Sequence, residues 1–337
     1  MATATPLHTD HTIDAEPIPT LDAIATQHFA LAPWVLRTPV FERHDFPSLE
    51  GTSLNFKFEL LQASGSFKVR GAFTNLLALD AAQRSVGVTC VSAGNHAAAV
   101  AYAAMRLGMS AKVVMFGSAN PARLELCKQY RAEIVMAGTP AEAFDLVRRI
   151  EAEEGRFFVH PFNGYRTVLG TATLGYEWAT QTPDLDAVIV PVGGGGLAAG
   201  VSTALRLANP RVHVYGVEPE GADAMSKSFA ANHTVKMGAM HTIADSLMAP
   251  YTEQYSYELC RRHVDRLVTV SDDEMRSAML KLFMQLKLAV EPACAAATAA
   301  LLGPLRETLQ GKRVGVLLCG TNTDPATFAA QIESVRN

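Results

Sequence analysis

Short runs rich in valine and isoleucine alternate with amphipathic segments along almost the whole chain of 337 residues. Helix-like segments separate strand-like runs at 53–60, 87–93, 112–116, 133–137, 187–192, 212–217 and 314–319. Strands that read as continuous apolar runs are typical of parallel sheets covered by helices on both faces. The alternation therefore predicts an α/β fold with mostly parallel sheets. The segment 222–266 lacks clear periodicity, and we expect a long irregular excursion there.

Composition argues against several classes of protein. Hydrophobic residues make up 49% and charged residues 18% of the chain, a balance that favours a folded core over disorder. Acidic residues (33) slightly outnumber basic ones (29) and no basic run occurs, which argues against nucleic acid or an anionic membrane as partner. The five cysteines form no CxxC pair, so we expect reduced thiols. With neither a secretory signal nor a membrane span in the sequence, we expect a soluble, cytoplasmic protein.

The run AVIVPVGGGGLAAG combines a buried strand, four glycines at 193–196 and a helix that starts near Leu197. Glycines allow the backbone to turn with its amides pointing inward, and the helix start adds free N–H groups and a positive dipole end. Such a segment is suited to hold a phosphate group. It matches neither a Walker loop nor a dinucleotide fingerprint. The alternative is a tight strand-to-helix turn without a ligand.

A second segment, SGSFKVRGAF (64–73), places Lys68 directly before an apparent helix. Most lysines are solvated surface charges, and Lys68 on its own could be one of them. However, Phe67 is adjacent, and a lysine in a partly apolar site loses its proton more readily and becomes an amine nucleophile.

Two further segments end strands in polar turns. In SAGNHA, the residues Ser92, Gly94, Asn95 and His96 lie at a helix start, where backbone N–H groups can bind a carboxylate. An ordinary N-cap is the alternative there. In LLCGTNTD, Cys319 taken alone would be a small core residue.

Together, SGSFKVRGA, SAGNHA, PVGGGG and LLCGTNTD occur in an order that resembles the pyridoxal-phosphate enzymes of fold type II, the tryptophan synthase beta-like family. The resemblance is closest to the serine/threonine dehydratase and serine racemase branch and covers about residues 30–330. It implies two open three-layer α/β/α domains with mostly parallel sheets and an active site between them. Residues 1–86 and 166–337 would form the large cofactor-binding domain, with 1–17 as a loose arm. Residues 87–165 would form a small, mobile domain that binds the substrate carboxylate.

The resemblance also implies roles for individual residues. Lys68 matches the lysine that holds pyridoxal 5'-phosphate as a Schiff base, and Phe67 matches the aromatic packed against the cofactor ring. Asn95 matches the partner of the ring hydroxyl, and Cys319 matches the residue that faces the ring nitrogen. The phosphate loop corresponds to Gly193, Gly194, Gly195, Gly196 and Leu197, and the carboxylate loop to Ser92, Ala93, Gly94, Asn95 and His96.

At several positions this chain departs from the pattern of the family or matches it only in part. Racemases of this branch have a serine where this chain has Ala93, which cannot carry a proton, so elimination is favoured over racemisation. Glu218 and Ala222 lie in a segment that resembles a site for a monovalent or divalent cation, but Ala224 replaces a frequent acidic ligand, and Glu218 could instead cap a turn. Three polar residues match positions near the cofactor or could be structural: Asp245, Ser246 and Glu291.

The sequence thus predicts a lyase that removes water from a 3-hydroxy amino acid and gives a 2-oxo acid and ammonia. L-Serine and L-threonine are the first expected substrates. A bulkier amino acid such as phenylserine is the alternative. 3-Hydroxyaspartate ranks lower, because no arginine is clearly placed to bind its second carboxylate. A racemase is less favoured. The family relationship implies a homodimer or homotetramer, and the sequence does not choose between them.

Overall fold

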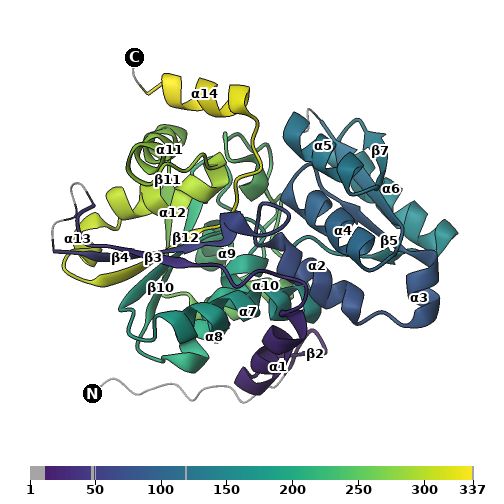
Figure 1. The fold of residues 1–337 in the computed structure, drawn as a ribbon, viewed down its shortest axis with the longest axis horizontal. Coiled ribbons are helices and arrows are strands. Elements are labelled where there is room, and N and C mark those ends of the chain that lie inside the picture. The colour runs from purple at the N-terminus through teal and green to yellow at the C-terminus, as the bar shows by residue number, and fades with distance from the viewer. Residues whose placement is uncertain (1–11, 47–48, 50, 118–119, 336–337) are drawn as a thin grey trace.

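Two separate sheets of largely parallel strands carry the fold, as the alternation predicts (Figure 1). The computed structural model describes residues 12–46, 49, 51–117 and 120–335. Neighbouring strands of the larger sheet are parallel except for β3 and β4. Its strand order is β11 (Arg266–Val270), β10 (His213–Pro219), β9 (Ala187–Pro191), β12 (Arg313–Leu318), β4 (Ser53–Phe58) and β3 (Val40–Arg43).

Helices cover both faces of this sheet (Figure 1). One face carries α11 (Asp272–Leu286) and α12 (Pro292–Leu302), and the other carries α7 (Tyr165–Gln181) and α8 (Gly196–Ala208). The Ser271–Glu274 capping box predicted from the sequence is present at the start of α11. The remaining helices near this sheet are α1 (Leu21–Leu31), η1 (Glu59–Leu61), α2 (Lys68–Leu77), α9 (Ala224–Ala231), η2 (Asp245–Leu247), α10 (Gln254–His263), α13 (Arg306–Leu309) and α14 (Pro325–Glu333). Helix α3 (Ala81–Val86) leads into the smaller sheet and lies beside it (Figure 1).

The smaller sheet has the order β7 (Glu133–Ala137), β6 (Ala111–Phe116), β5 (Val88–Val91) and β8 (Phe157–Phe158), and all its strands are parallel. Successive residues of β6 face opposite sides, because Val113 packs in a cluster with α4 (Asn95–Arg106) and Val114 in one with α6 (Pro140–Glu154). Helix α5 (Pro121–Gln129) begins at the expected Pro121. The three-layer architecture is confirmed, while the residue limits of the two domains remain a prediction.

Two segments are more ordered than the sequence suggested. Within the expected loose arm, β1 (Thr12–Ile13) and β2 (Glu16–Pro17) form a hairpin, while residues 1–11 of that arm lie outside the described residues. Tertiary contacts hold the hairpin, since the Tyr255 hydroxyl donates to the Pro17 carbonyl. The expected irregular excursion contains two helices, α9 and α10, joined by a long connection that includes η2. Among the described residues, no helix combines the length and apolar character needed to cross a membrane.

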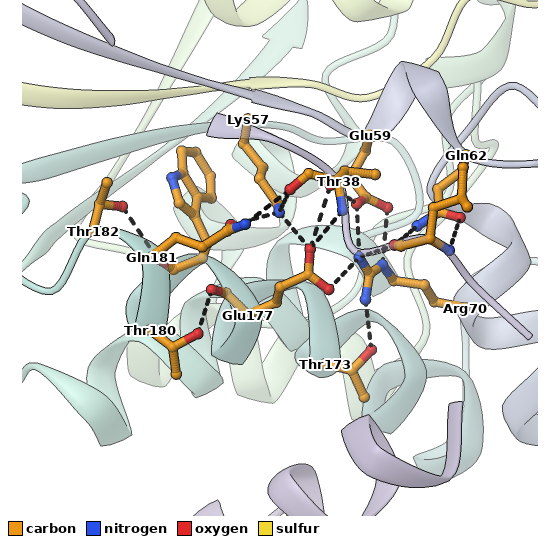
Figure 2. Close-up of polar contacts among 12 residues, drawn as sticks. Thr38, Lys57, Glu59, Gln62, Arg70, Thr173, Glu177, Thr180, Gln181 and Thr182 are labelled. Atoms are coloured by element: carbon orange, nitrogen blue, oxygen red, sulfur yellow. Dashed lines mark hydrogen bonds and ion pairs between the residues drawn. The ribbon is translucent and has the colours of Figure 1, made fainter. Parts of the chain in front are cut away.

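A buried network of charges fixes helix α2, which begins at Lys68 (Figure 2). Arg70 donates from Nε and Nη2 to both oxygens of Glu59, at 2.9 and 2.8 Å, and also reaches Glu177 of α7 at 3.0 Å. Lys57 of β4 donates to the same Glu177 at 2.5 Å. All four side chains are at most 1% exposed. The two positive and two negative charges therefore neutralise one another inside the core, and their ion pairs connect β4, α2 and α7.

Candidate active site

The glycine loop turns directly after β9, at the carboxyl edge of the larger sheet. Gly195 has φ +96°, a conformation that side-chain-bearing residues rarely adopt. A Cβ at Gly194 would lie 2.3 Å from the Phe162 ring, and one at Gly196 would lie 2.4 Å from the Phe162 carbonyl oxygen. Helix α8 starts at Gly196 without a side-chain cap. Its first N–H groups are therefore available to an anion, as the sequence predicts for a phosphate cradle.

Lys68 lines a small cavity beside this cradle, and its side chain is half-buried there. The cavity is lined among others by Phe67, Lys68, His96, Phe162, Gly196 and Leu197. The Lys68 Nζ atom donates to the Pro161 carbonyl at 2.5 Å and lies 5.3 Å from the centre of the Phe67 ring. Burial lowers the pKa of Lys68 to about 8, although the negative charge of Glu291 opposes the shift. The amine thus loses its proton far more readily than a solvated lysine, which suits a nucleophile and a base.

The predicted carboxylate loop connects β5 to α4. Gly94 N–H donates to the Ser92 hydroxyl at 3.0 Å, and α4 begins at Asn95 without a side-chain cap. His96 is hydrogen-bonded through Nε2 to the Val159 carbonyl at 2.8 Å, and burial lowers the pKa of His96 to about 3. The histidine is therefore neutral, and the free N–H groups and positive dipole of α4 are the groups of this loop that could bind an anion.

Cys319 follows β12 and is joined to the lysine segment through the backbone, since Phe67 N–H donates to its carbonyl at 3.1 Å. A hydrogen bond with Cys294 and burial together hold the pKa of the Cys319 thiol well above its usual value. The thiol is therefore uncharged. An uncharged thiol is a weak base, which agrees with the predicted role of a weak partner for the ring nitrogen.

The three remaining polar candidates lie around a residue that the sequence did not single out, Arg123 of α5. Its guanidinium donates to both oxygens of Asp245, to the Ser246 hydroxyl at 3.0 Å and to Glu291 at 3.4 Å. Glu291 in turn accepts from Asn95 at 2.6 Å. Arg123 differs from the other arginines of the chain in no sequence motif. Its position in the first turn of α5 is buried, and the sequence pattern does not predict that burial.

Glu218 caps a helix in the structure. Its oxygens accept from the N–H groups of Met225 and Ser226, both at 2.8 Å, and from the Ser226 hydroxyl. Burial raises the pKa of Glu218 to about 7. No group of three or more His, Cys, Asp or Glu suited to a metal occurs in the described part of the chain. These contacts match the turn-capping alternative, and a cation at Glu218 and Ala222 remains a prediction.

The residues present fit a phosphate-bearing aldehyde cofactor. The glycine loop is a cradle that a Cβ would fill, and a lysine with a lowered pKa shares its cavity. The model of the family described as "Pyridoxal-phosphate dependent enzyme" matches residues 31–320. The chain belongs to this family, and its cofactor is pyridoxal 5'-phosphate.

Similarity to individual proteins indicates which kind of pyridoxal-phosphate-dependent enzyme the chain is. The chain is 68% identical to a phenylserine dehydratase from Ralstonia pickettii, over 95% of this chain and 98% of the relative. It is 35% identical to an L-threonine ammonia-lyase from Thermotoga maritima, over 90% of this chain and 76% of the relative. The solved structure of maize serine racemase has a TM-score of 0.88 at 34% identity and covers 94% of this chain and 97% of that one. The resemblance inferred from the motifs is confirmed, and the chain is a pyridoxal-phosphate-dependent lyase.

Replacing Gly196 with alanine should weaken cofactor binding about 10-fold or more, which corresponds to ~1.4 kcal/mol. The added Cβ would meet the Phe162 carbonyl oxygen, which is itself held by the Ser256 hydroxyl at 2.7 Å. The start of α8 must therefore shift and misplace its N–H groups. Titration of the cofactor-free protein with pyridoxal phosphate measures the change. Gly238→Ala is the matched control, since a Cβ there meets nothing within 4 Å; equal affinities in the two variants would contradict the cradle.

Proposed function

We propose that this hydroxy-amino-acid dehydratase acts on phenylserine or on a 3-hydroxy amino acid of similar bulk. The 68% identity to the phenylserine dehydratase, over nearly the full length of both chains, carries the proposal. The motifs alone rank L-serine and L-threonine first, because they describe the cofactor and carboxylate loops and not the pocket for the side chain. The similarity favours the bulkier substrate that the sequence offers as the alternative.

The segment 244–250, ADSLMAP, supports a bulky apolar substrate. It lies between the two loops, since a Cβ at Gly193 would be 3.2 Å from the Leu247 Cα and one at Gly94 would be 3.6 Å from the Ser246 hydroxyl. A substrate that spans the carboxylate loop and the cofactor would therefore lie beside this segment. Its Leu247 and Met248 are apolar, which is in keeping with a large hydrophobic aryl group on the substrate.

Residues of the chain bind the cofactor and the substrate and transfer the α-proton. When bound, pyridoxal phosphate supplies the electron sink for the reaction. The N–H groups at the start of α8 hold its phosphate, and those at the start of α4 hold the substrate carboxylate. The Lys68 amine removes the α-proton as general base. The β-hydroxyl leaves with a proton as water, and hydrolysis of the product then gives the 2-oxo acid and ammonia.

Two residues bear on the alternative activities. The methyl side chain of Ala93 cannot donate or accept a proton. The substrate face opposite Lys68 therefore lacks a side-chain acid at this position, which favours elimination over racemisation. Arg123 lies beside the carboxylate loop, 3.4 Å from a Cβ at Gly94, but Asp245 and Glu291 already neutralise it. This pairing disfavours a second substrate carboxylate, as in 3-hydroxyaspartate.

A turnover panel tests the proposal. The purified holoenzyme is given the stereoisomers of phenylserine, then serine, threonine and 3-hydroxyaspartate, and 2-oxo acid, ammonia and D-amino acid are measured. We expect kcat/KM to be at least about 10–200-fold higher for a phenylserine isomer than for serine, because a single methylene group in an apolar pocket already provides that range. Equal or faster turnover of serine or threonine would overturn the substrate assignment. D-Amino acid in excess of 2-oxo acid would overturn the reaction type.

A further inference from the structure

Four buried residues from separate parts of the chain close a ring of hydrogen bonds, called here the Arg123 ring. Arg123 donates from Nη2 to Glu291 at 3.4 Å and from Nε to the Asn322 carbonyl at 3.0 Å. Asn95 donates from Nδ2 to Glu291 at 2.6 Å and accepts at Oδ1 from Asn322 Nδ2 at 2.8 Å. Each of the four residues is at most 6% exposed. The ring links α5, α4, the start of α12 and the turn after β12.

We propose that Arg123 is a positioning residue that, through Glu291 and Asn322, fixes the amide of Asn95 with one N–H directed to a cofactor oxygen. The inference rests on the proposed role of Asn95 beside the cofactor. Glu291 is the acceptor of one Asn95 N–H, and among the described residues the second N–H of this amide has no acceptor. Because the Asn95 oxygen accepts from Asn322 and one N–H donates to Glu291, the orientation of the amide is fixed and its second N–H is free to donate to a ligand.

The charge of Arg123 maintains this arrangement. Burial raises the pKa of Glu291, Asp245 raises it further, and Arg123 opposes both effects. Lys68 and the uncharged Cys319 are the other titratable groups whose pKa values Glu291 influences. Without Arg123, Glu291 takes up a proton more readily and its carboxyl can then donate. Asn95 would then be held less firmly as a donor, because a neutral carboxyl accepts its N–H more weakly than a carboxylate does.

Arg123 also couples this amide to the docking of α5. The helix comes from the part of the chain that carries the smaller sheet, whereas Glu291 and Asn322 belong to the part that carries the larger one. Asn120, at the start of the same helix, donates to Asp324 at 2.9 Å, and the Tyr130 hydroxyl donates to the Ala63 carbonyl. Docking of α5 thereby places the guanidinium beside Glu291, and the donor orientation of Asn95 follows from it.

Absorption of the bound cofactor tests the proposal without any substrate. The holoenzyme and its Arg123→Met and Arg123→Lys variants are titrated across the pH range in which each is folded. We expect Arg123→Met to show a spectrum that departs from the wild type at low pH and returns to it at high pH, since Glu291 protonates on acidification. Arg123→Lys keeps the charge and should retain the wild-type pH profile. Lys128→Met, which removes an exposed charge of the same helix, should match the wild type.

A second variant separates positioning from folding. Glu291→Gln keeps the size of the side chain but removes its charge, so the cofactor spectrum should be altered at every pH. For Arg123→Met we expect kcat to fall about 10–100-fold, the usual cost of losing such a supporting contact, with a smaller change in KM. Wild-type spectra in folded Arg123→Met or in Glu291→Gln would overturn the proposal. A wild-type protein that binds no pyridoxal phosphate would instead contradict the cofactor site itself.

Discussion

Replacing Lys68 with alanine should abolish turnover and the visible absorption of the bound cofactor. Loss of a general base alone costs about 10²–10⁴-fold in rate, and loss of the covalent attachment adds to it. Lys68 shares its cavity with the glycine cradle, and burial lowers its pKa to about 8, so no exposed lysine can replace it. Absorption spectra after incubation with pyridoxal phosphate and assays of 2-oxo acid formation measure the two losses.

The matched control for this variant is Lys128→Ala, because Lys128 is exposed on α5. It should retain both the absorption and the turnover. The fold of the Lys68→Ala protein should persist, since the lysine contributes one hydrogen bond, to the Pro161 carbonyl, and no ion pair within the described residues. A folded Lys68→Ala variant that kept its absorption and its activity would exclude this lysine as the cofactor-binding residue.

Replacing Glu177 with alanine should lower the free energy of unfolding by about 3–5 kcal/mol, the usual cost of removing one partner from a buried ion pair. Glu177 is paired with Lys57 and Arg70, and all three side chains are at most 1% exposed (Figure 2). Without it, Glu59 is the remaining carboxylate of the network and two cations stay buried. Urea denaturation followed by circular dichroism measures the loss.

Glu151→Ala is the control for this second variant. Glu151 pairs with Arg148 on the surface, where side-chain exposures are 39% and 62%, and such pairs contribute about 0–1 kcal/mol. A Glu177→Ala protein no less stable than the Glu151→Ala protein would show that the network does not hold α2. Because α2 begins at Lys68, we also expect Glu177→Ala to weaken cofactor binding in the fraction that remains folded.

By itself, the sequence determined the fold class and predicted the central groups of the site. Apolar runs, the glycines at 193–196, the capping box at Ser271 and the first-turn proline Pro121 are local signals, and each acts on neighbours along the chain. Parallel strands then bring their carboxyl ends to one edge, so the loops after β9 and β12 meet without further information.

Only the tertiary structure decided which charges pair inside the protein. Arg70 meets Glu177 across 107 positions of the sequence, and Arg123 meets Glu291 across 168. It also decided that Glu218 caps α9 and that residues 12–17 form a hairpin. The physical reason is that burial sets the cost of an isolated charge, and burial depends on how distant segments pack. Local periodicity predicts which face of a helix or strand is apolar, but it does not predict which other segment of the chain packs against that face.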